Sequence, residues 1–209
     1  VSSTSSTIPG YTYTKYPSVP SMYDSPDCLI PLSEMVKKAV SIPVIAAAVT
    51  DIEDGEEALK SGKADMVAVG RAFLADAYWG LNPQIGKNTR PCMRCNYCHI
   101  NVLLGRNISC TVNPGLLREY RDLNEVRTIV KRKVLIIGGG PGGMETALQA
   151  KANGHDVVIY EKSPKLGGAL RIASIPHFKT RTRKLFDYYI KEIENSGIRV
   201  VTSKDVNEE

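Results

Sequence analysis

Four of the five cysteines in this chain lie within nineteen residues, at Cys92, Cys95, Cys98 and Cys110. Three follow one another at two-residue gaps, and the fourth arrives from farther along the chain. This arrangement is typical of a cubane iron–sulfur cluster, because three thiolates surround one face and a distant thiolate completes the set. The spacing therefore predicts a [4Fe–4S] cluster. The alternatives are a structural zinc ion, which usually takes two separated C-x2-C pairs, and unliganded thiols.

A glycine-rich turn at Gly138, Gly140 and Gly143 follows an apolar strand and opens an expected helix. The first glycine permits the tight turn, the second lets backbone amides approach a pyrophosphate, and the third lets helix and strand pack closely. Glu161 closes the next strand 23 positions after Gly138. Its carboxylate would accept hydrogen bonds from an adenosine ribose and would repel a 2′-phosphate. The pattern predicts FAD, NAD or ADP at this site rather than NADP.

Two further pairs of residues could approach phosphate groups. Gly167 and Gly168 follow Glu161 at a spacing more typical of FAD domains than of dehydrogenases. Gly70 and Arg71 follow an apolar strand, and in parallel barrels ligands gather at the C-terminal ends of strands. A backbone amide and a guanidinium there would form a phosphate clamp, although an arginine after a strand is more often an ordinary surface residue.

Composition limits the class of protein. With 209 residues and 43% apolar content, the chain can bury one ordinary core or contribute to two. The sequence contains no run of eighteen apolar residues, so no membrane span is predicted, and no secretory leader is expected. An odd number of cysteines, four of them clustered, favours metal ligation in a reducing cytoplasm over disulfides.

The formal net charge of +5 comes largely from basic residues on both sides of the glycine turn. They are Arg118, Arg121, Arg127, Lys131, Arg132 and Lys133 before it, and Lys179, Arg181, Arg183 and Lys184 after it. Because no base-stacking aromatics are interleaved with the first group, we expect no nucleic-acid partner. Such runs are usually solvated faces or sites for phosphorylated small molecules.

Helices and strands are expected to alternate along the chain. Residues 1–31 are interrupted by prolines and predict a long loop. A helix is predicted at 33–40, a strand at 43–48, a helix from 50 or 51 to 62, and a strand at 65–69. Since both strands are apolar on both faces, this part predicts a parallel α/β sheet or barrel.

A nucleotide-binding βαβ unit is predicted from residue 133 onward. Its strands are expected at 134–137, 157–160 and 198–201, and its helices at 142–152 and across 185–193. Residues 81–132 form an irregular connector that contains the clustered cysteines. We therefore divide the chain into residues 1–80, 81–132 and 133–209, the first ending one α/β domain and the last beginning another.

Six segments occur in an order that resembles the NADH:flavin oxidoreductase family, whose old yellow enzyme-type barrels are fused to a flavin domain. They are residues 42–46, 64–76, 90–96, 110–114 and 134–143, and the pair 160–162 with 166–168. The family includes 2,4-dienoyl-CoA reductase, 2-enoate reductases, bile-acid oxidoreductases and trimethylamine dehydrogenase. The likeness covers most of residues 32–206, and the ordered set is specific although no single segment is.

The resemblance implies a (β/α)8 TIM barrel that holds FMN, a four-iron cluster beside it, and a Rossmann-like domain that binds FAD and NAD(P)H. Residues 1–80 would end the barrel, 81–132 would hold the cluster, and 133–209 would be the first half of the FAD domain. The family's FMN-phosphate pair matches Gly70 and Arg71, and its cluster ligands match the four cysteines. Its FAD-binding positions match Gly138, Gly140, Pro141, Gly142, Gly143, Glu161, Lys162 and Gly168.

One segment departs from the family pattern. A Gly-Arg or similar pair usually follows the seventh strand and holds the other side of the FMN phosphate, whereas this chain reads Ala-Ala-Ala-Val at 46–49 and is one residue shorter. The family's proton-donating Tyr and His would lie before Val1, so no catalytic residue is predicted. His99 and His177 are expected to be surface histidines, and Cys28 an ordinary buried or loop thiol.

The resemblance further implies an oxidoreductase that reduces an activated C=C bond of the enoate, enoyl-CoA or enone class. Electrons would pass from NAD(P)H through FAD and the cluster to FMN, while the protein fixes distances and potentials. The alternatives are an amine dehydrogenase of the trimethylamine dehydrogenase type, with ADP in place of FAD, and a non-catalytic electron-transfer subunit. Expected partners are an unsaturated small molecule, the rest of the polypeptide or a complementary subunit, and a second copy in a homo-oligomer.

Overall fold

The computed structural model describes residues 17–25, 27–118 and 130–206. The chain divides into two compact units, Val1–Leu117 and Arg118–Glu209, and each contains helices with a parallel sheet. The predicted α/β class is therefore confirmed. Most of the expected N-terminal loop, and Arg121 and Arg127 of the basic stretch, lie outside the described residues.

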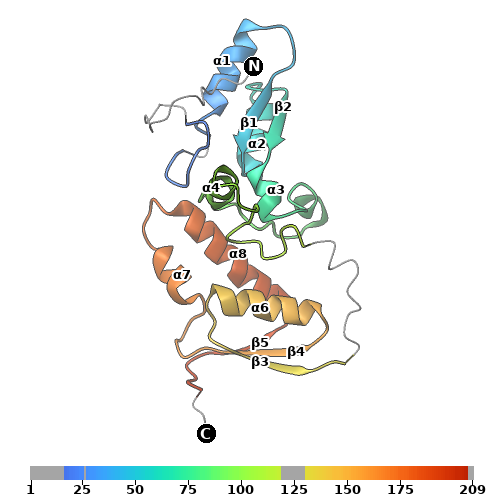
Figure 1. The fold of residues 1–209 in the computed structure, drawn as a ribbon, viewed down its shortest axis with the longest axis vertical. Helices are drawn as coiled ribbons and strands as arrows, with labels where there is room; N and C mark the ends of the chain where they lie inside the picture. The colour runs from blue at the N-terminus through green and yellow to red at the C-terminus, as the bar shows by residue number, and fades with distance from the viewer. Residues whose placement is uncertain (1–16, 26, 119–129, 207–209) are drawn as a thin grey trace. The chain divides into compact units, whose positions relative to one another are not determined.

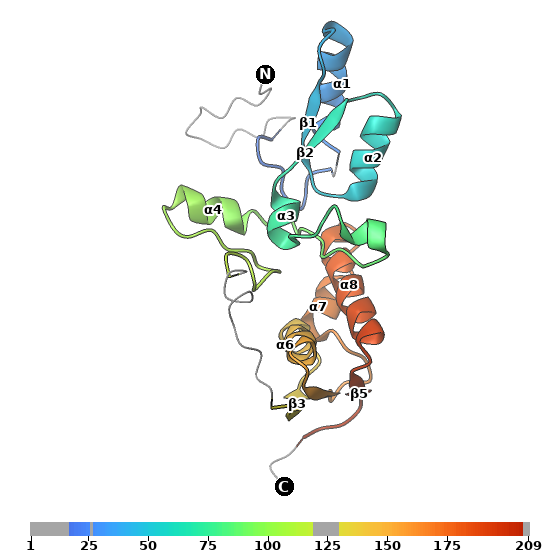
Figure 2. The ribbon, with the colours of Figure 1, turned by 90° about the vertical axis from the view of Figure 1, so that its right-hand side faces the viewer.

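The first unit is built on two parallel strands, β1 (Ile45–Val49) and β2 (Met66–Val69). Helix α2 (Ile52–Lys60) packs on both strands, and α1 (Ile30–Ala39) packs on β1 (Figures 1 and 2). The buried side chains between them are small or branched: Val44, Ala46, Val49, Ala58 and Ala64. These are the four elements predicted for this part of the chain.

Two details of the first unit differ from expectation. Helix α1 begins at Ile30, three residues before the predicted start, because Pro31 lies in the first turn, where a helix needs no N–H from it. The strands are not buried on both faces by the described residues, since Ile45 is 54% and Met66 is 48% exposed. Alternate residues of β1 and β2 therefore face away from the described core.

Short elements complete the first unit. They are α3 (Arg71–Ala75), the 3-10 helix η1 (Asn82–Ile85) and α4 (Tyr97–Leu103). The segment with the four clustered cysteines belongs to this unit. The described helices include none whose length and apolar content would let it span a bilayer.

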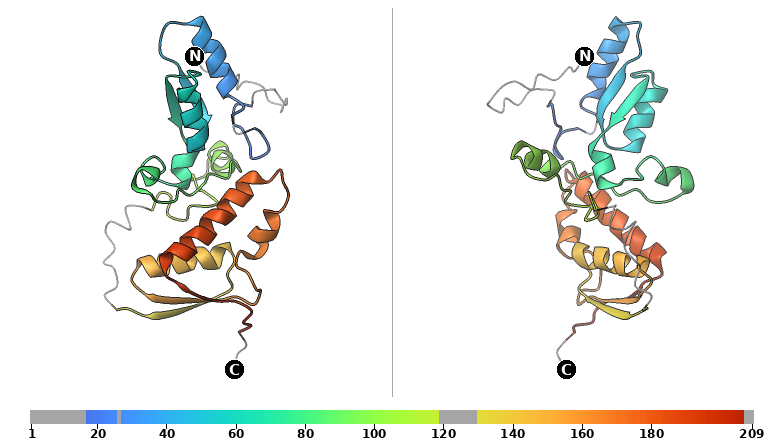
Figure 3. Two further views of the ribbon diagram at one scale, coloured as in Figure 1. Left: turned by 180° about the vertical axis from the view of Figure 1, so that it is seen from behind. Right: turned by 45° about the vertical axis from the view of Figure 1, so that its right-hand side comes forward.

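The second unit contains three parallel strands in the order β3 (Lys133–Ile137), β4 (Asp156–Tyr160) and β5 (Arg199–Val201). Helices α6 (Pro141–Ala152) and α8 (Thr180–Ser196) lie side by side on one face of this sheet (Figures 1 and 3). The short helix α7 (Gly168–Ala173) packs on α8. The core is formed by Met144, Ala147, Ile159, Leu185, Tyr189 and Ile193.

The sequence explains how α8 forms and ends. Leu185, Tyr189 and Ile193 recur at every fourth position, so they lie on one face of the helix, and all three are buried. The helix ends at Gly197, whose φ of 66° is the left-handed conformation that commonly follows a helix. The chain then enters β5, which pairs with β4.

Gly143 sets the distance between α6 and the glycine turn. An ideal Cβ at this position would lie 2.0 Å from the carbonyl oxygen of Gly138. We expect Gly143→Ala to lower the free energy of unfolding by about 2 kcal/mol or more, because the backbone must shift to admit the methyl group.

Gly142→Ala is the matched control for this prediction. A Cβ on Gly142 would meet no described atom within 4 Å, and alanine is the better helix former. Urea unfolding of both variants measures the difference, and equal midpoints would contradict the packing role of Gly143.

Candidate functional site

The cysteine segment folds as a loop with two residues in the left-handed backbone conformation. Arg94 has φ 49° and Asn96 has φ 59°, and each stands between two cysteines. Residues other than glycine seldom adopt this conformation, and those that do are held there by surrounding structure. Asn96 directly precedes α4, so Cys98 lies in the first turn of that helix.

The structure brings the four clustered cysteines together, and none of them forms a disulfide. Cys92 is buried, Cys98 and Cys110 are half-buried, and Cys95 is exposed. Burial raises the pKa of the Cys92 and Cys98 thiols, and the neighbouring Cys95 and Cys110 sulfurs raise both further. Cys92 and Cys98 therefore each lie within electrostatic range of Cys95 and Cys110.

Hydrogen-bonding groups contact three of the sulfurs. The Arg94 N–H donates to Cys92 Sγ at 3.4 Å, the His99 N–H donates to Cys98 Sγ, and Thr111 Oγ1 lies 3.3 Å from Cys95 Sγ. Donors of this kind stabilise the thiolate form, which is the form that ligates metal. The sequence motif predicts the ligands but not these surrounding groups.

The arrangement of the sulfurs bears on which metal group they suit. In the described part of the chain, no three His, Cys, Asp or Glu side chains converge as one metal ion would require. A structural zinc needs four ligands at about 2.0–2.3 Å from a single ion. A four-iron cluster binds each thiolate through a different iron atom, so its ligands stand farther apart. The four free thiols of this segment supply the kind of donor that a cluster takes.

Gly70 and Arg71 lie directly after β2 and line an open cavity of about 480 Å³. The ends of β1 and β2 form one part of its wall, and Cys98 and His99 form another. The volume is in the range of about 300–1,000 Å³ that suits cofactors and small ligands. The structure thus places the predicted phosphate pair and one predicted cluster ligand at the same cavity.

The Arg71 guanidinium is held by two oxygen acceptors. Its Nη1 donates to the Pro20 carbonyl oxygen at 2.6 Å and to the side-chain oxygen of Asn96. Asn96 was not among the predicted site residues, since an asparagine in a loop matches no motif. Its position between two predicted ligands, Cys95 and Cys98, is the signal that could have identified it.

The segment that departs from the family pattern has an unusual backbone. Ala48 has φ 64°, and the pairing of β1 with β2 changes register between Ala46 and Val49. Ala48 lines the cavity beside Gly70. The β1 wall of this cavity therefore presents alanine and valine side chains, and a conformation that glycine would adopt more easily.

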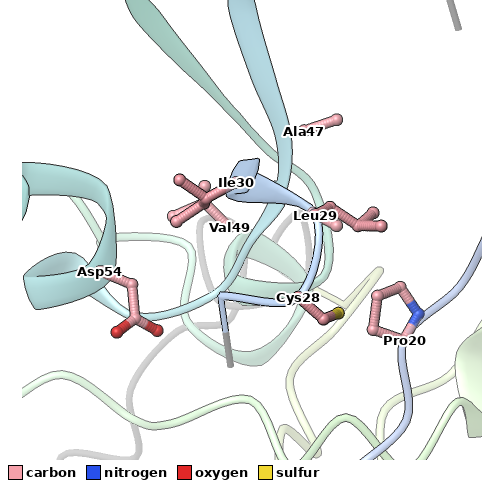
Figure 4. Close-up of a pocket in the computed structure, with 8 residues that line it drawn as sticks. Pro20, Cys28, Leu29, Ile30, Ala47, Val49 and Asp54 are labelled. Carbon is pink, nitrogen blue, oxygen red and sulfur yellow. The ribbon is translucent and has the colours of Figure 1, made fainter. Parts of the chain in front are cut away.

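Cys28 lies apart from the other four cysteines. Arg94 Nη2 donates to Cys28 Sγ at 3.8 Å, and burial raises the pKa of the Cys28 thiol despite the opposing effect of Arg94. Cys28 lines a tight crevice without room for a water molecule, and its thiol points toward Pro20 (Figure 4). This is the environment of an ordinary packed thiol.

His99 and His177, both expected from the sequence to lie at the surface, differ in exposure. His177 is exposed and makes an edge contact with Phe178 at 5.6 Å between ring centroids. His99 is half-buried and lines the cavity. Its position follows from α4, which turns the residue after Cys98 toward the cavity.

In the second unit, the glycine turn has the geometry that its pattern requires. Gly138 has φ 95°, and a Cβ on Gly140 would meet no described atom within 4 Å. The Gly167 N–H donates to the Gly139 carbonyl oxygen at 2.8 Å, and a Cβ on Gly168 would lie 3.2 Å from Gly140 Cα. The structure therefore brings the two glycine-rich segments into contact.

Glu161 is 6% exposed and accepts two backbone hydrogen bonds. Its Oε2 accepts from the Gly139 N–H at 2.6 Å, and its Oε1 accepts from the Ser163 N–H at 2.8 Å. The Ser163 and Gly139 donors lower the pKa of the Glu161 carboxyl. Lys162 beside it is exposed. Glu161 thus ties the glycine turn to the end of β4, and each of its oxygens can accept a further bond.

Comparison with known proteins assigns the second unit to a flavin-binding class. Residues 133–201, which include the glycine turn and Glu161, match the family model described as FAD dependent oxidoreductase. A solved structure of 2-naphthoyl-CoA reductase with 2-naphthoyl-CoA is similar to 90% of this chain, with a TM-score of 0.82 and 27% identity, over 29% of that protein.

Two relatives of known name are more similar in sequence. NADH oxidase of Thermoanaerobacter brockii is 39% identical over 176 residues, which are 81% of this chain and 27% of that protein. Cinnamate reductase of Clostridium sporogenes is 36% identical over 192 residues, which are 88% of this chain and 28% of that protein. The chain thus spans less than a third of the length of either relative.

The fold and these similarities are those of flavin-dependent oxidoreductases. The chain belongs to the NADH:flavin oxidoreductase family of old yellow enzyme-type proteins, as its ordered sequence segments predict.

Glu161 should give the chain a pH-dependent stability. Backbone donors lower the pKa of this carboxyl in the folded chain. The ionised carboxylate therefore stabilises the folded chain fully above the ordinary carboxyl pKa, and this stabilisation is lost as the pH falls through the lowered pKa. We expect Glu161→Gln to lower the free energy of unfolding by about 1 kcal/mol near neutral pH.

The effect of this substitution should shrink in acid, where the native carboxyl is itself protonated. Urea unfolding near pH 7 and at a series of lower pH values, continued below the usual carboxyl range until the native carboxyl is protonated, measures the change. A difference between variant and native chain that stays constant between these conditions would contradict the charged role of Glu161.

Proposed function

We propose that this chain is part of a flavin and iron–sulfur reductase that acts on an activated C=C bond of an enoate, enoyl-CoA or enone substrate. The observation that carries the proposal is the single cavity that both Arg71 and Cys98 line. The names of two relatives, cinnamate reductase and 2-naphthoyl-CoA reductase, support an unsaturated acid or thioester as substrate. The cofactors would be FMN, FAD and a [4Fe–4S] cluster, with NAD(P)H as the electron donor.

The two units would then be parts of larger domains. We infer that β1 and β2 are the last strands of an FMN-binding (β/α)8 barrel within residues 1–80, followed by the cluster connector at 81–132. Residues 133–209 would begin a Rossmann-like FAD domain. The rest of the polypeptide, or a complementary subunit, would supply the missing strands and the catalytic acid. A cytoplasmic location suits the free thiols.

The FMN phosphate would be held by Gly70 and Arg71. A guanidinium recognises phosphate through several directed hydrogen bonds, and Gly70 leaves open space where a side chain would project. Because the β1 side of the cavity offers only Ala47, Ala48 and Val49, Arg71 would be the main cation on the phosphate. When bound, FMN supplies hydride transfer and the cluster supplies one-electron transfer.

The cluster would be held by Cys92, Cys95, Cys98 and Cys110. The protein's own contribution is the left-handed loop that turns these thiols toward one another and the N–H groups that stabilise their thiolates. Cys98 would bring the cluster to the wall of the flavin cavity. Electron transfer between the cluster and FMN requires the two groups to lie close together.

Metal analysis tests the cluster assignment. The intact protein, purified without oxygen, should contain iron and acid-labile sulfide near four each per chain. The Cys98→Ser variant should lose most of its iron and most of its acid-labile sulfide, because one iron atom loses its thiolate ligand.

Cys28→Ser is the matched control, since Cys28 lies apart from the four clustered sulfurs and should keep the full iron content. One zinc per chain with no sulfide in the native protein would show that the cysteines hold a different metal.

FAD content tests the second unit. Gly140→Ala would place a methyl group where the pyrophosphate approaches the turn. The variant should fold normally, because that methyl meets no described atom within 4 Å, yet it should bind FAD at least about tenfold more weakly.

The FAD released from native and variant protein can be measured against iron content, which should not change. Glu161→Ala is the less selective variant, because it also removes the acceptor of two structural hydrogen bonds. Full FAD retention by Gly140→Ala would place the nucleotide elsewhere, and bound ADP in place of FAD would favour the amine dehydrogenase alternative.

A further inference from the structure

A chain of hydrogen bonds joins the proposed phosphate clamp to the proposed cluster loop. Arg71 Nη1 donates to the side-chain oxygen of Asn96. Asn96 Nδ2 in turn donates to the Val19 carbonyl oxygen at 3.1 Å. The amide of Asn96 is therefore fixed at both ends, and its orientation determines where the Arg71 guanidinium lies.

The backbone of Asn96 makes this connection direct. Asn96 stands between Cys95 and Cys98 in the left-handed conformation, with φ 59°, and α4 begins at the next residue. A displacement of its side chain would act on the loop that carries both cysteines. No flexible linker separates the amide from the ligands.

The Arg71 charge reaches both sites. Arg71 lines the cavity together with Cys98, and its guanidinium donates to Asn96, which stands between Cys95 and Cys98. A phosphate in the cavity and a thiolate-ligated cluster are both anionic. One permanent cation would therefore be shared between two negative groups.

We propose that Asn96 is the positioning residue that couples the flavin site to the cluster, by holding the Arg71 guanidinium where it serves both. This inference rests on the proposed function. The phosphate of bound FMN partly neutralises the positive charge of Arg71. FMN therefore makes the cluster harder to reduce. Linkage requires the reciprocal effect, namely that FMN binds more tightly while the cluster is oxidised.

A redox titration of the intact protein, followed by the paramagnetic resonance of the reduced cluster, tests the coupling. Removal of FMN should favour cluster reduction by about tenfold, which is about 59 mV for a one-electron couple. In Asn96→Gly the side chain is lost without backbone strain, because glycine adopts a positive φ readily. The response of the cluster to FMN should then fall below about twofold.

Two aspartate variants separate this role from a general effect of added charge. Asn96→Asp places a carboxylate against the guanidinium and should weaken FMN binding by about tenfold. Asn113→Asp makes the same change three residues after Cys110, where the native side chain contacts the Leu74 carbonyl and the Gly115 N–H. This control should keep the native affinity for FMN.

The outcomes are distinct. An Asn96→Gly cluster that still responds to FMN as the native one does would overturn the coupling, and so would a native cluster whose potential is the same with and without FMN. The cluster potential of the native protein with and without FMN can be measured without any variant, so it tests the coupling even if Asn96→Gly does not fold. Native protein without FMN or without an iron–sulfur signal would instead overturn the proposed function.

Discussion

The hydrogen bonds of the Arg71 guanidinium hold the first unit together around its cavity. They join the end of β2 to the Pro20 carbonyl and to the cysteine segment through Asn96. These three segments are far apart in sequence, and the two-stranded sheet between them is too small to position the loop alone. This guanidinium links the segment of Gly70 directly to the loop of Cys98, and the Asn113 side chain adds a second link through the Leu74 carbonyl. The geometry of both proposed cofactor sites in this unit therefore depends in part on the Arg71 side chain.

In the second unit, the segments of the proposed site are brought together by glycines, which lack a side chain and let the backbone segments approach closely. Gly143 lets α6 approach the Gly138 carbonyl, and Gly168 lies against Gly140 where the second glycine-rich segment meets the turn. Backbone groups then face the space that a pyrophosphate would occupy. The pyrophosphate part of this site would consist of main-chain amides, whereas the first unit relies on a guanidinium and four thiols.

The three strands and α6 of the second unit could be predicted to within a residue, because an apolar strand and a glycine turn are strong local signals. Helix α8 was expected only across 185–193 but extends over Thr180–Ser196, and the short helix α7 was not predicted. Cys92, Cys95, Cys98 and Cys110 could likewise be proposed as a ligand set from their spacing. The roles of Asn96 and Thr111 could not, since each depends on contacts with a residue that only folding brings near. The left-handed Ala48 also escaped prediction, because alanine gives no local signal for a positive φ.

Glu161 shows how a structural and a ligand-binding role can reside in one carboxylate. Its two backbone hydrogen bonds orient the group, lower its pKa and keep it ionised before any nucleotide arrives. A ribose hydroxyl would then meet a fixed acceptor with free lone pairs, so binding would not have to order the side chain. The contacts that stabilise the empty turn are the same contacts that prepare it. A carboxylate held by solvent alone would lose rotamer freedom on binding, and the affinity for the ribose would be correspondingly lower.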